Sequence, residues 1–430
     1  MRRFKVQSLA SKILLTAYGL CLTAFYVNAQ DSLTILLNGT LHVGNGQVIE
    51  NSAVAMQYGK ILWTADARVI RLDATAKIID VAGKHIYPGF IAPNTTLGLR
   101  EIELVRATND QNEVGEFNPN TRALVAYNTD SRVIPTVRSN GVLIAQSVPQ
   151  GGRIPGTSSV FKLDGWNWED AVLKADDGVH LVWPVMQTRT GWWAEPGTSN
   201  ENKNYVKQVS EVYDFLEQAK SYCLSKPEKT NLRFEAMRGV FDKTQNLYVH
   251  AHYVRDILSA IELAKRFDVR MVLVGGRDSW MITNELKENN IPVILRRTHS
   301  LPANPEDDID QPYKTAKQLH DAGVMFCLSD NGFWQQRNLP FQAGTAVAYG
   351  LPYEEAVKAI TANTAAILGI ADRVGSVEEG MDATLIVSSG DALDMRTNNI
   401  EVAFINGQPI QLKNHQDENY ERYMKKYGVE

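Results

Sequence analysis

Cysteine is scarce in this chain. Only three cysteines occur among 430 residues, and no two of them form a CxxC motif. This scarcity excludes a disulfide framework as the basis of the fold, even in an oxidising compartment. Beyond the N-terminal region, the sequence also lacks an apolar run long enough for a transmembrane helix. The fold must therefore rest on an ordinary hydrophobic core, for which 44% hydrophobic residues are sufficient.

An excess of positive charge is also absent. The formal net charge is −5 at pH 7. The first 29 residues contain four basic and no acidic residues, so their removal changes the net charge to −9. A mildly acidic surface argues against nucleic acid or anionic lipid as a partner. We therefore expect the partner to be a small-molecule substrate or ligand.

The N-terminus has the layout of a secretory signal peptide. Basic residues precede the apolar run Ile13–Val27, and Val27-Asn28-Ala29 is a small-residue exit. We predict cleavage after Ala29, and hence an exported protein that is periplasmic if its source is a Gram-negative bacterium. No stable membrane insertion is expected after cleavage. The alternative is an uncleaved membrane anchor, which the shortness of the apolar run disfavours.

Short runs of alternating apolar and polar residues mark both ends of the mature chain. They occupy residues 30–86 and residues 373–412, where Asn406-Gly407 predicts a hairpin turn. We predict that both segments build one small β-sandwich domain, with a large domain at residues 87–372 inserted between them. Residues 413–430 form a polar C-terminal tail by composition.

The large domain consists of repeated strand–helix units. From Leu232 onward, apolar strands alternate with helical patterns such as Val254–Arg266, whose apolar residues fall on one stripe. This alternation predicts an α/β fold, and the number of units favours a (β/α)8 TIM-like barrel over an open sheet.

Two segments of the large domain do not follow this strand–helix alternation. The polar stretch 100–135 is either a lid or a rim insertion. The glycine-rich loop 151–159 either holds an anion or forms a tight turn.

Polar side chains follow the predicted strands. The apolar run Leu247–Val249 leads into His250 and His252, which share one face because side chains alternate along a strand. Asp330 follows a second apolar run, and Arg296 and Arg297 follow a third. In parallel barrels the active site lies at these strand ends. Imidazoles and a carboxylate are the ligands of a zinc-like hydrolytic site, in which the ion lowers the pKa of bound water toward about 7.

Each candidate also has a plainer interpretation. Histidines at strand ends are often structural, as we expect of His180, and the alternative for His299 is an ordinary loop residue. The alternative for Asp330 is that it only closes a turn. Arg296 and Arg297 either bind a substrate carboxylate in a bidentate manner or pair with the acidic residues 307–308.

With these motifs in place, the chain resembles the amidohydrolase superfamily, and in particular its imidazolonepropionase-like branch. Five stretches carry the resemblance, and they span nearly the whole mature chain: Tyr87–Ile91 with Leu97–Leu99, Val249–His252, Leu328–Asp330, Asn363–Gly369 and Gly375–Ala383. The resemblance implies hydrolysis of non-peptide C–N bonds, often in cyclic amides, with one or two divalent metal ions.

The chain departs from the family at the metal ligands. The family has His-x-His at the end of the first strand, whereas this sequence has Asn94-Thr95-Thr96. The sixth-strand histidine position corresponds to Gly275, and near the fourth strand the nearest carboxylate is Glu235. His250 and Asp330 are retained, so His252 or His299 would have to complete the set. These departures argue against a binuclear centre and leave either one zinc-like divalent ion or none.

Two functions of different class follow. The first is an exported amidohydrolase with a mononuclear or atypical site. In it Asp330 is the general base, His250, His252 and Asp330 hold the ion, and the substrate contacts Arg153, Arg296 and His299. The second is a catalytically inactive homologue that binds a small amide-like molecule or supports an active paralogue as a partner subunit. Either protein could be a homo-oligomer.

Overall fold

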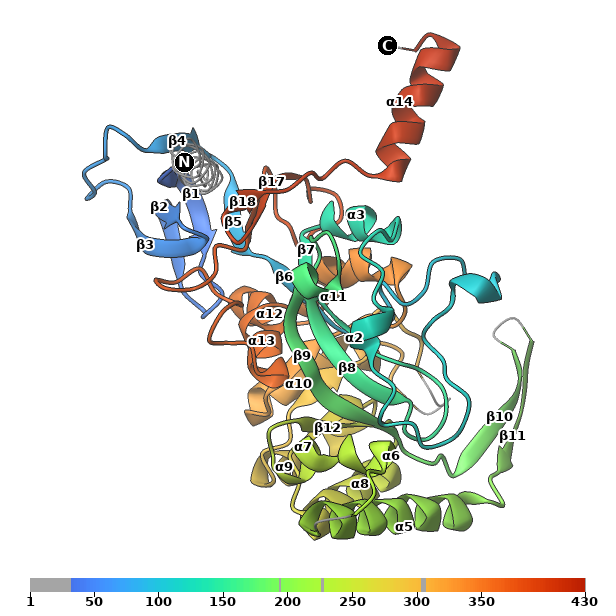
Figure 1. Cartoon of the computed structure of the whole chain (residues 1–430). Coiled ribbons are helices and arrows are strands. Elements are labelled where there is room, and N and C mark those ends of the chain that lie inside the picture. The colour runs from blue at the N-terminus through green and yellow to red at the C-terminus, as the bar shows by residue number, and fades with distance from the viewer. Residues whose placement is uncertain (1–31, 193–194, 226–227, 303–306, 430) are drawn as a thin grey trace, which may run out of the picture.

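The computed structural model describes residues 32–192, 195–225, 228–302 and 307–429. The predicted signal peptide therefore lies outside the described residues. Figure 1 shows a large body of strands surrounded by helices, with a smaller sheet beside it and one C-terminal helix that projects away from both. Of the helices described, none combines the length and the apolar character that crossing a bilayer requires.

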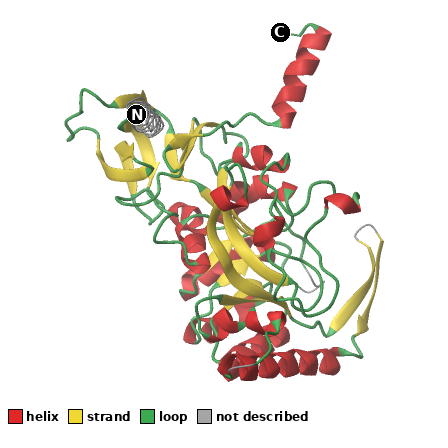
Figure 2. Ribbon diagram, in the orientation of Figure 1, coloured by secondary structure: helices red, strands yellow, loops and turns green. Residues whose placement is uncertain are grey.

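Eight strands form the sheet of the large body, in the order β6-β7-β8-β9-β12-β13-β14-β15. Figure 2 shows these strands, in yellow, enclosed by helices. The end of the first strand lies against the loop after the last one, because the Thr96 amide donates to the Gly332 carbonyl at 3.0 Å. The sheet thus curves into the predicted TIM-like barrel. Its strands are β6 Phe90–Thr95, β7 Val142–Ser147, β8 Gly156–Lys162, β9 Val172–Val182, β12 Asn246–Ala251, β13 Met271–Gly275, β14 Val293–Leu295 and β15 Phe326–Leu328.

One barrel strand runs against the others. β8 is antiparallel to both β7 and β9, whereas the other neighbouring pairs are parallel. Parallel neighbours need a crossover connection of a dozen or more residues, usually with a helix. The connection 148–155 is too short for one, so the chain returns directly. The regular eightfold alternation that the sequence suggested is broken at this strand.

Helices and short helical turns surround the barrel. α8 Val254–Phe267 is the helix that the sequence predicted after the fifth strand, and its buried residues include Ile257, Ile261 and Ala264. The other elements are η1 Arg106–Thr108, α2 Ala123–Ala126, α3 Val133–Arg138, α4 Trp168–Ala171, α5 Tyr205–Leu224, α6 Leu232–Glu235, α7 Arg238–Phe241, η2 Ser279–Met281, α9 Thr283–Glu288, α10 Gln311–Ala322, η3 Trp334–Asn338, α11 Leu339–Ala348, α12 Tyr353–Ala359 and α13 Ala362–Leu368.

The barrel interior contains both apolar and polar side chains. Ile91, Ile144, Tyr248 and Ile294 belong to one buried hydrophobic cluster contributed by several strands. His250 lies two residues beyond Tyr248 on β12, so its side chain faces the same interior. Buried polar side chains also occur at this level, because His180 pairs with Tyr248 and Asp177 lies further toward the N-terminal end of β9, whereas His250 lies toward the C-terminal end of β12.

Strands from both ends of the described chain meet in a second eight-stranded sheet. β5 joins the two parts, because it pairs with β1 on one side and with β16 on the other. The division of the chain into domains at the predicted boundaries stays a prediction. The strands are β1 Thr34–His42, β2 Val48–Gln57, β3 Lys60–Asp66, β4 Lys77–Asp80, β5 His85–Pro88, β16 Leu385–Ser388, β17 Ile400–Ile405 and β18 Gln408–Pro409.

Three peripheral segments complete the structure. The polar stretch 100–135 runs beside the glycine-rich loop through isolated bridges such as Phe117 to Ile154. A hairpin of β10 Gln187–Trp192 and β11 Glu195–Glu201 extends from the barrel. The polar tail contains α14 His415–Tyr427, which begins with a capping box between Asn414 and Asp417 and buries none of its residues.

Candidate functional site

A continuous chain of hydrogen bonds lies behind His250. Its Nε2 atom is 2.8 Å from Nδ1 of His180, and Nε2 of His180 is 2.9 Å from the Ser158 hydroxyl. Ser158 donates to one oxygen of Asp177 at 2.8 Å, and the Tyr248 hydroxyl donates to the other at 2.7 Å. His180, Ser158, Asp177 and Tyr248 are fully buried. Buried polar groups of this kind hold their geometry firmly, because breaking any one bond leaves two groups unsatisfied.

The carboxylate of Asp177 decides which atoms donate and which accept in this series of hydrogen bonds. Asp177 accepts a third hydrogen bond, from Gln146 at 2.8 Å, and an ionised carboxylate offers enough acceptor sites for all three. Burial raises the pKa of Asp177, while its hydrogen bonds from Tyr248, Ser158 and Gln146 act in the opposite direction. When Asp177 is ionised, Ser158 points its hydrogen away from His180 and accepts the N–H on Nε2 of His180. Nδ1 of His180 is then bare and accepts the proton on Nε2 of His250. Burial lowers the pKa of His250 to about 4, so His250 is neutral at pH 7 and its bare nitrogen is Nδ1.

His180 was expected to be structural, and Glu235 was named as the nearest carboxylate to the fourth strand. In the structure the fourth barrel strand is β9, and it carries His180 toward the interior. Glu235 instead lies on α6 and pairs with Arg238 at 2.7 Å, with much of its side chain exposed, whereas the buried carboxylate Asp177 belongs to the fourth strand itself. In the sequence, His180 is a polar residue between two apolar neighbours in a strand. That pattern indicates a buried histidine but does not predict its hydrogen bond to His250.

Asp330 follows β15 and is buried, with 2% of its surface exposed. One carboxylate oxygen accepts the Gln342 side-chain amide at 3.1 Å, and the other has no hydrogen-bond partner. Burial raises the pKa of Asp330 to about 6, although Arg297 and Arg296 act in the opposite direction. Gln342, on α11, also accepts from the Thr298 hydroxyl at 2.7 Å. This residue was not predicted, although a lone glutamine in an apolar helix was a signal that could have identified it.

The two degenerate ligand positions lie at the end of β6. Asn94 and Thr96 are 8% and 4% exposed. The Oδ1 atom of Asn94 and the hydroxyl of Thr96 are both buried without a hydrogen-bond partner. The backbone N–H of Asn94 donates to Oε1 of Gln146 at 3.0 Å. This bond links the end of β6 to the hydrogen-bond network around Asp177.

His252 lies just beyond β12, beside the sixth-strand position Gly275. A Cβ atom at Gly275 would lie 2.2 Å from Cε1 of His252, and the backbone there has a φ of +99°. The imidazole of His252 thus fills the space that a side chain at this position would need. Its Nδ1 atom is buried without a partner. Burial, followed by the nearby Arg296 and Arg277, lowers the pKa of His252 to about 3.

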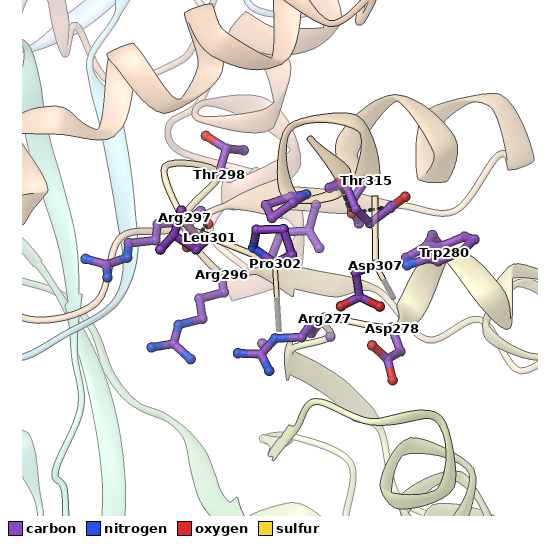
Figure 3. Close-up of a pocket in the computed structure, with 16 residues that line it drawn as sticks. Arg277, Asp278, Trp280, Arg296, Arg297, Thr298, Leu301, Pro302, Asp307 and Thr315 are labelled. Atoms are coloured by element: carbon purple, nitrogen blue, oxygen red, sulfur yellow. Dashed lines mark hydrogen bonds between the residues drawn. The ribbon is translucent and has the colours of Figure 1, made fainter. Parts of the chain in front are cut away.

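Three arginines gather beside these residues. Arg277, Arg296 and other residues of the β13 and β14 ends line a pocket with an empty volume of ≈ 610 Å³. Figure 3 shows the guanidinium groups of Arg277, Arg296 and Arg297 extending to one side, away from Trp280 and Asp307. None of the three arginines forms an ion pair with another described residue, and Nε of Arg296 is buried without a partner. Burial and the two other arginines lower the pKa of Arg296.

The remaining predicted contacts lie around the same mouth. Arg153 donates to the carbonyl of Val182 at 3.1 Å, and Val182 pairs with His250 across β9 and β12. His299 is 2.6 Å from the Thr345 hydroxyl, and its backbone amide donates to Gln342. His299 is therefore linked to Asp330 through Gln342. The pairing of Arg296 and Arg297 with residues 307–308 is not formed; Asp308 instead pairs with Lys314 at 2.9 Å.

The donor atoms do not fit the metal centre that the resemblance implies. A zinc site usually has about three protein ligands in addition to water. Within the described ranges, no group of three or more histidine, cysteine, aspartate or glutamate side chains is placed to hold an ion. His250, His252 and Asp330 therefore do not converge as a ligand set. Asn94 and Thr96 offer only neutral oxygens, which are poor zinc ligands.

Comparison with curated proteins gives relatives of low identity. "Amidohydrolase tasK" from Hapsidospora irregularis is 21% identical over 360 residues, which is 76% of this chain but 36% of that protein. The chain therefore spans about a third of the length of that relative. An imidazolonepropionase from Fusobacterium nucleatum is 23% identical over 381 residues, covering 82% of this chain and 88% of that protein. A second imidazolonepropionase, from Thermoplasma volcanium, is 31% identical over 110 residues, 24% of this chain and 27% of that protein. These relatives support the branch that the motifs predicted.

Solved structures agree on the fold, and a family model identifies the chain. An amidohydrolase from Thermotoga maritima MSB8 superimposes with a TM-score of 0.75 at 25% identity, covering 88% of this chain and 99% of that one. A Xaa-Pro dipeptidase with bound methionine gives 0.55 at 15% identity, covering 88% and 100%, and shows the fold alone. The model of the amidohydrolase family matches residues 196–410. Because that match spans half of the sequence, the chain belongs to the amidohydrolase family.

Proposed function

We propose that this protein is a hydrolase that cleaves a non-peptide C–N bond in a small, cyclic amide-like substrate, with Asp330 as the general base. The observation that carries the proposal is the setting of Asp330. Its carboxylate is buried at a strand end, accepts a hydrogen bond from Gln342 through one oxygen, and has no hydrogen-bond partner on the other. A carboxylate with a pKa of about 6 is ionised at pH 7 and still basic enough to take a proton from water.

These residues support hydrolysis by attack of a water molecule on the carbonyl carbon. Asp330 removes a proton from water as the oxygen attacks the carbonyl carbon. The negative charge that develops on the carbonyl oxygen needs a donor, and the unpartnered guanidinium of Arg296 lies beside the same mouth. The proton on Asp330 then passes to the departing nitrogen as the C–N bond breaks, which leaves a carboxylic acid and an amine. No step in this scheme depends on a metal ion.

The arginine-rich mouth supports an anionic substrate. Arg277, Arg296 and Arg297 lie together and form no close ion pair with a described residue, although Asp330 and Asp278 are near enough to attract them, so a substrate carboxylate would relieve their mutual repulsion. Arg153, which donates to the Val182 carbonyl, and His299, which lies beside the Thr345 hydroxyl, are proposed as further substrate contacts. A small cyclic amide with a carboxylate substituent is the substrate class that this arrangement favours.

A second candidate function rests on the replaced ligands. With Asn94, Thr96 and Gly275 in place of three family histidines, the protein could be a catalytically inactive homologue that binds the same class of molecule or supports an active paralogue as a partner subunit. Turnover decides between the two functions. Purified protein would be incubated with a panel of lactams, imides and hydantoins, each with and without a carboxylate, beside the Asp330→Asn variant. Hydrolysis that the variant loses supports the first function, and binding without hydrolysis supports the second.

We also propose that the protein is exported, with cleavage after Ala29. The support is the three-part layout of the first 29 residues. N-terminal sequencing of the protein recovered from its native host would test this proposal, because an uncleaved chain would begin at Met1 and a processed chain at Gln30.

A further inference from the structure

Three buried oxygens at the barrel mouth have no hydrogen-bond partner. They are Oδ1 of Asn94, the hydroxyl oxygen of Thr96 and Oδ1 of Asp330. All three residues are more than nine-tenths buried, at 8%, 4% and 2% exposure. Leaving a buried polar group unpaired costs about 1–3 kcal/mol, and such groups are rare in folded proteins. Three of them at one strand-end site indicate that a ligand supplies the missing partners.

The three residues belong to one site because their backbones are joined. The Thr96 amide donates to the carbonyl of Gly332, which is two residues beyond Asp330, at 3.0 Å. Asn94 is fixed from the other side by the bond between its backbone amide and Gln146. Its backbone φ is +54°, a left-handed conformation that asparagine adopts more readily than other residues with a Cβ. β6 also loses its regular register at this point, between Ala92 and Thr95.

The chemistry of these atoms specifies the ligand. A side-chain carboxamide presents a carbonyl acceptor and an N–H donor side by side, so its natural partner is a second amide whose N–H and C=O also lie on one side. Only a cis amide has that arrangement, and amides in small rings are cis. This pairing is complete whichever way the Asn94 side chain is turned. The hydroxyl oxygen of Thr96 shares the lactam N–H with Oδ1 of Asn94, and the unpartnered oxygen of Asp330 accepts any further N–H of the ring.

We propose that Asn94, Thr96 and Asp330 form a recognition site for the cis-amide edge of a cyclic substrate, at the positions where the family resemblance places metal ligands. In this chain an organic hydrogen-bonding group takes the place of the ion. The inference rests on the proposed function for its substrate class, but it concerns binding and does not require turnover. It assigns a role to the two residues that replace the His-x-His motif.

The test uses a matched pair of probes, 5-oxoproline and N-methyl-5-oxoproline. Both carry a lactam carbonyl and a carboxylate for the arginines, and only the first has a lactam N–H. Isothermal titration calorimetry on the full mature chain should show that 5-oxoproline binds about tenfold more tightly, since one such hydrogen bond in a buried site is worth about 1–3 kcal/mol. The preference should disappear in Asn94→Leu and shrink in Thr96→Val, while the affinity for the N-methyl probe, which keeps only the carbonyl contact, falls less than the affinity for 5-oxoproline.

The neighbouring residue offers a matched control. Thr95 lies between the two positions, but its hydroxyl donates to the Gln146 carbonyl at 3.1 Å and accepts from the Leu97 amide. Thr95→Ser keeps these bonds, so it should keep the tenfold preference. Thr96→Val is nearly isosteric and has no backbone strain, so it reports on the site even if Asn94→Leu folds poorly.

Several results would overturn the inference. Equal affinity for the two probes, a preference that persists in both Asn94→Leu and Thr96→Val, or no binding of either probe at millimolar concentration would each do so. A stoichiometric divalent ion that is lost on mutation of Asn94 would also refute it. Failure of the proposed function gives a different pattern, in which the N–H preference is present and hydrolysis is absent.

Discussion

Nε2 of His250 lies 2.8 Å from Nδ1 of His180, so the two imidazoles satisfy each other inside the barrel. His180 also stacks on the ring of Tyr248, with centroids 4.6 Å apart and planes 14° from parallel. One end of the pair is anchored through Ser158 to a buried carboxylate. This contact uses Nε2 of the fifth-strand histidine and leaves Nδ1 as its only nitrogen available to a ligand.

The first prediction concerns the stability of this network. His180→Leu keeps the approximate volume but leaves His250 and Ser158 without their shared partner. The Ser158 hydroxyl still bonds Gln146 and Asp177, so the loss of the His250 partner and of one bond to Ser158 should lower the free energy of unfolding by roughly 1–3 kcal/mol. Chemical denaturation followed by circular dichroism would measure the loss. His415→Leu, on the exposed helix α14, is the control and should change stability by less than about 0.5 kcal/mol. Wild-type stability in His180→Leu would show that the network contributes nothing.

The second prediction concerns activity and pH. If Asp330 is the base, kcat/KM should rise as the pH increases through about 6, because only the ionised carboxylate accepts a proton. Asp330→Asn should lower kcat/KM by about 10²-fold or more across the whole range. The measurement is a pH–rate profile with whichever cyclic amide the panel identifies. A flat profile between pH 5 and pH 8, or full turnover in the variant, would exclude Asp330 as the base.

The same variant should be more stable than the wild type at neutral pH. The pKa of Asp330 is raised from 3.8 in the unfolded chain to about 6 in the folded protein, so folding disfavours the ionised form. The penalty is absent below pH 3.8, grows as the pH rises and is complete above about 6. It amounts to at most about 3 kcal/mol, and the neutral amide of the Asp330→Asn variant cannot incur it. Thermal unfolding at pH 4 and pH 8 should therefore show a gain for Asp330→Asn only at pH 8.

The sequence predicted the barrel, the shared small sheet and the fifth-strand position of His250, because these features follow from local periodicity and from turn residues. It did not predict the reversed strand β8, since antiparallel and parallel strands have the same apolar pattern when both faces are buried. It also missed the partners of the site. His180 and His250 are 70 residues apart in the sequence. Gln342, on helix α11, reaches Asp330, which follows strand β15. Such contacts depend on tertiary packing, which no local pattern encodes.

The third prediction concerns metal content. Protein purified without added metal should contain less than one tightly bound divalent ion per chain, because Asn94 and Thr96 are weak ligands and no three histidine, cysteine or acidic side chains of the described residues are placed to hold an ion. Elemental analysis would measure the stoichiometry. The double variant Asn94→His, Thr96→His should bind more metal than the wild type, and cobalt absorption spectra would report the new nitrogen ligands. Two tightly held ions in the wild type would contradict this interpretation of the first strand.

The last prediction separates a steric effect from a backbone effect at the sixth-strand position. Gly275 has a φ of +99°, so any residue with a Cβ is strained there, and its Cβ would also lie 2.2 Å from the His252 ring. Gly83 has a φ of +73° and nothing within 4 Å of its Cβ position, so Gly83→Ala measures the backbone cost alone. Gly275→Ala should therefore destabilise the protein by at least about 1–2 kcal/mol more than Gly83→Ala, because the buried imidazole must move. Equal losses of stability in the two variants, measured by denaturation, would mean that the His252 side chain moves aside without an energetic cost. A larger loss at Gly275 would mean that glycine and His252 are a matched pair, and that a histidine cannot be restored at this position without displacing His252.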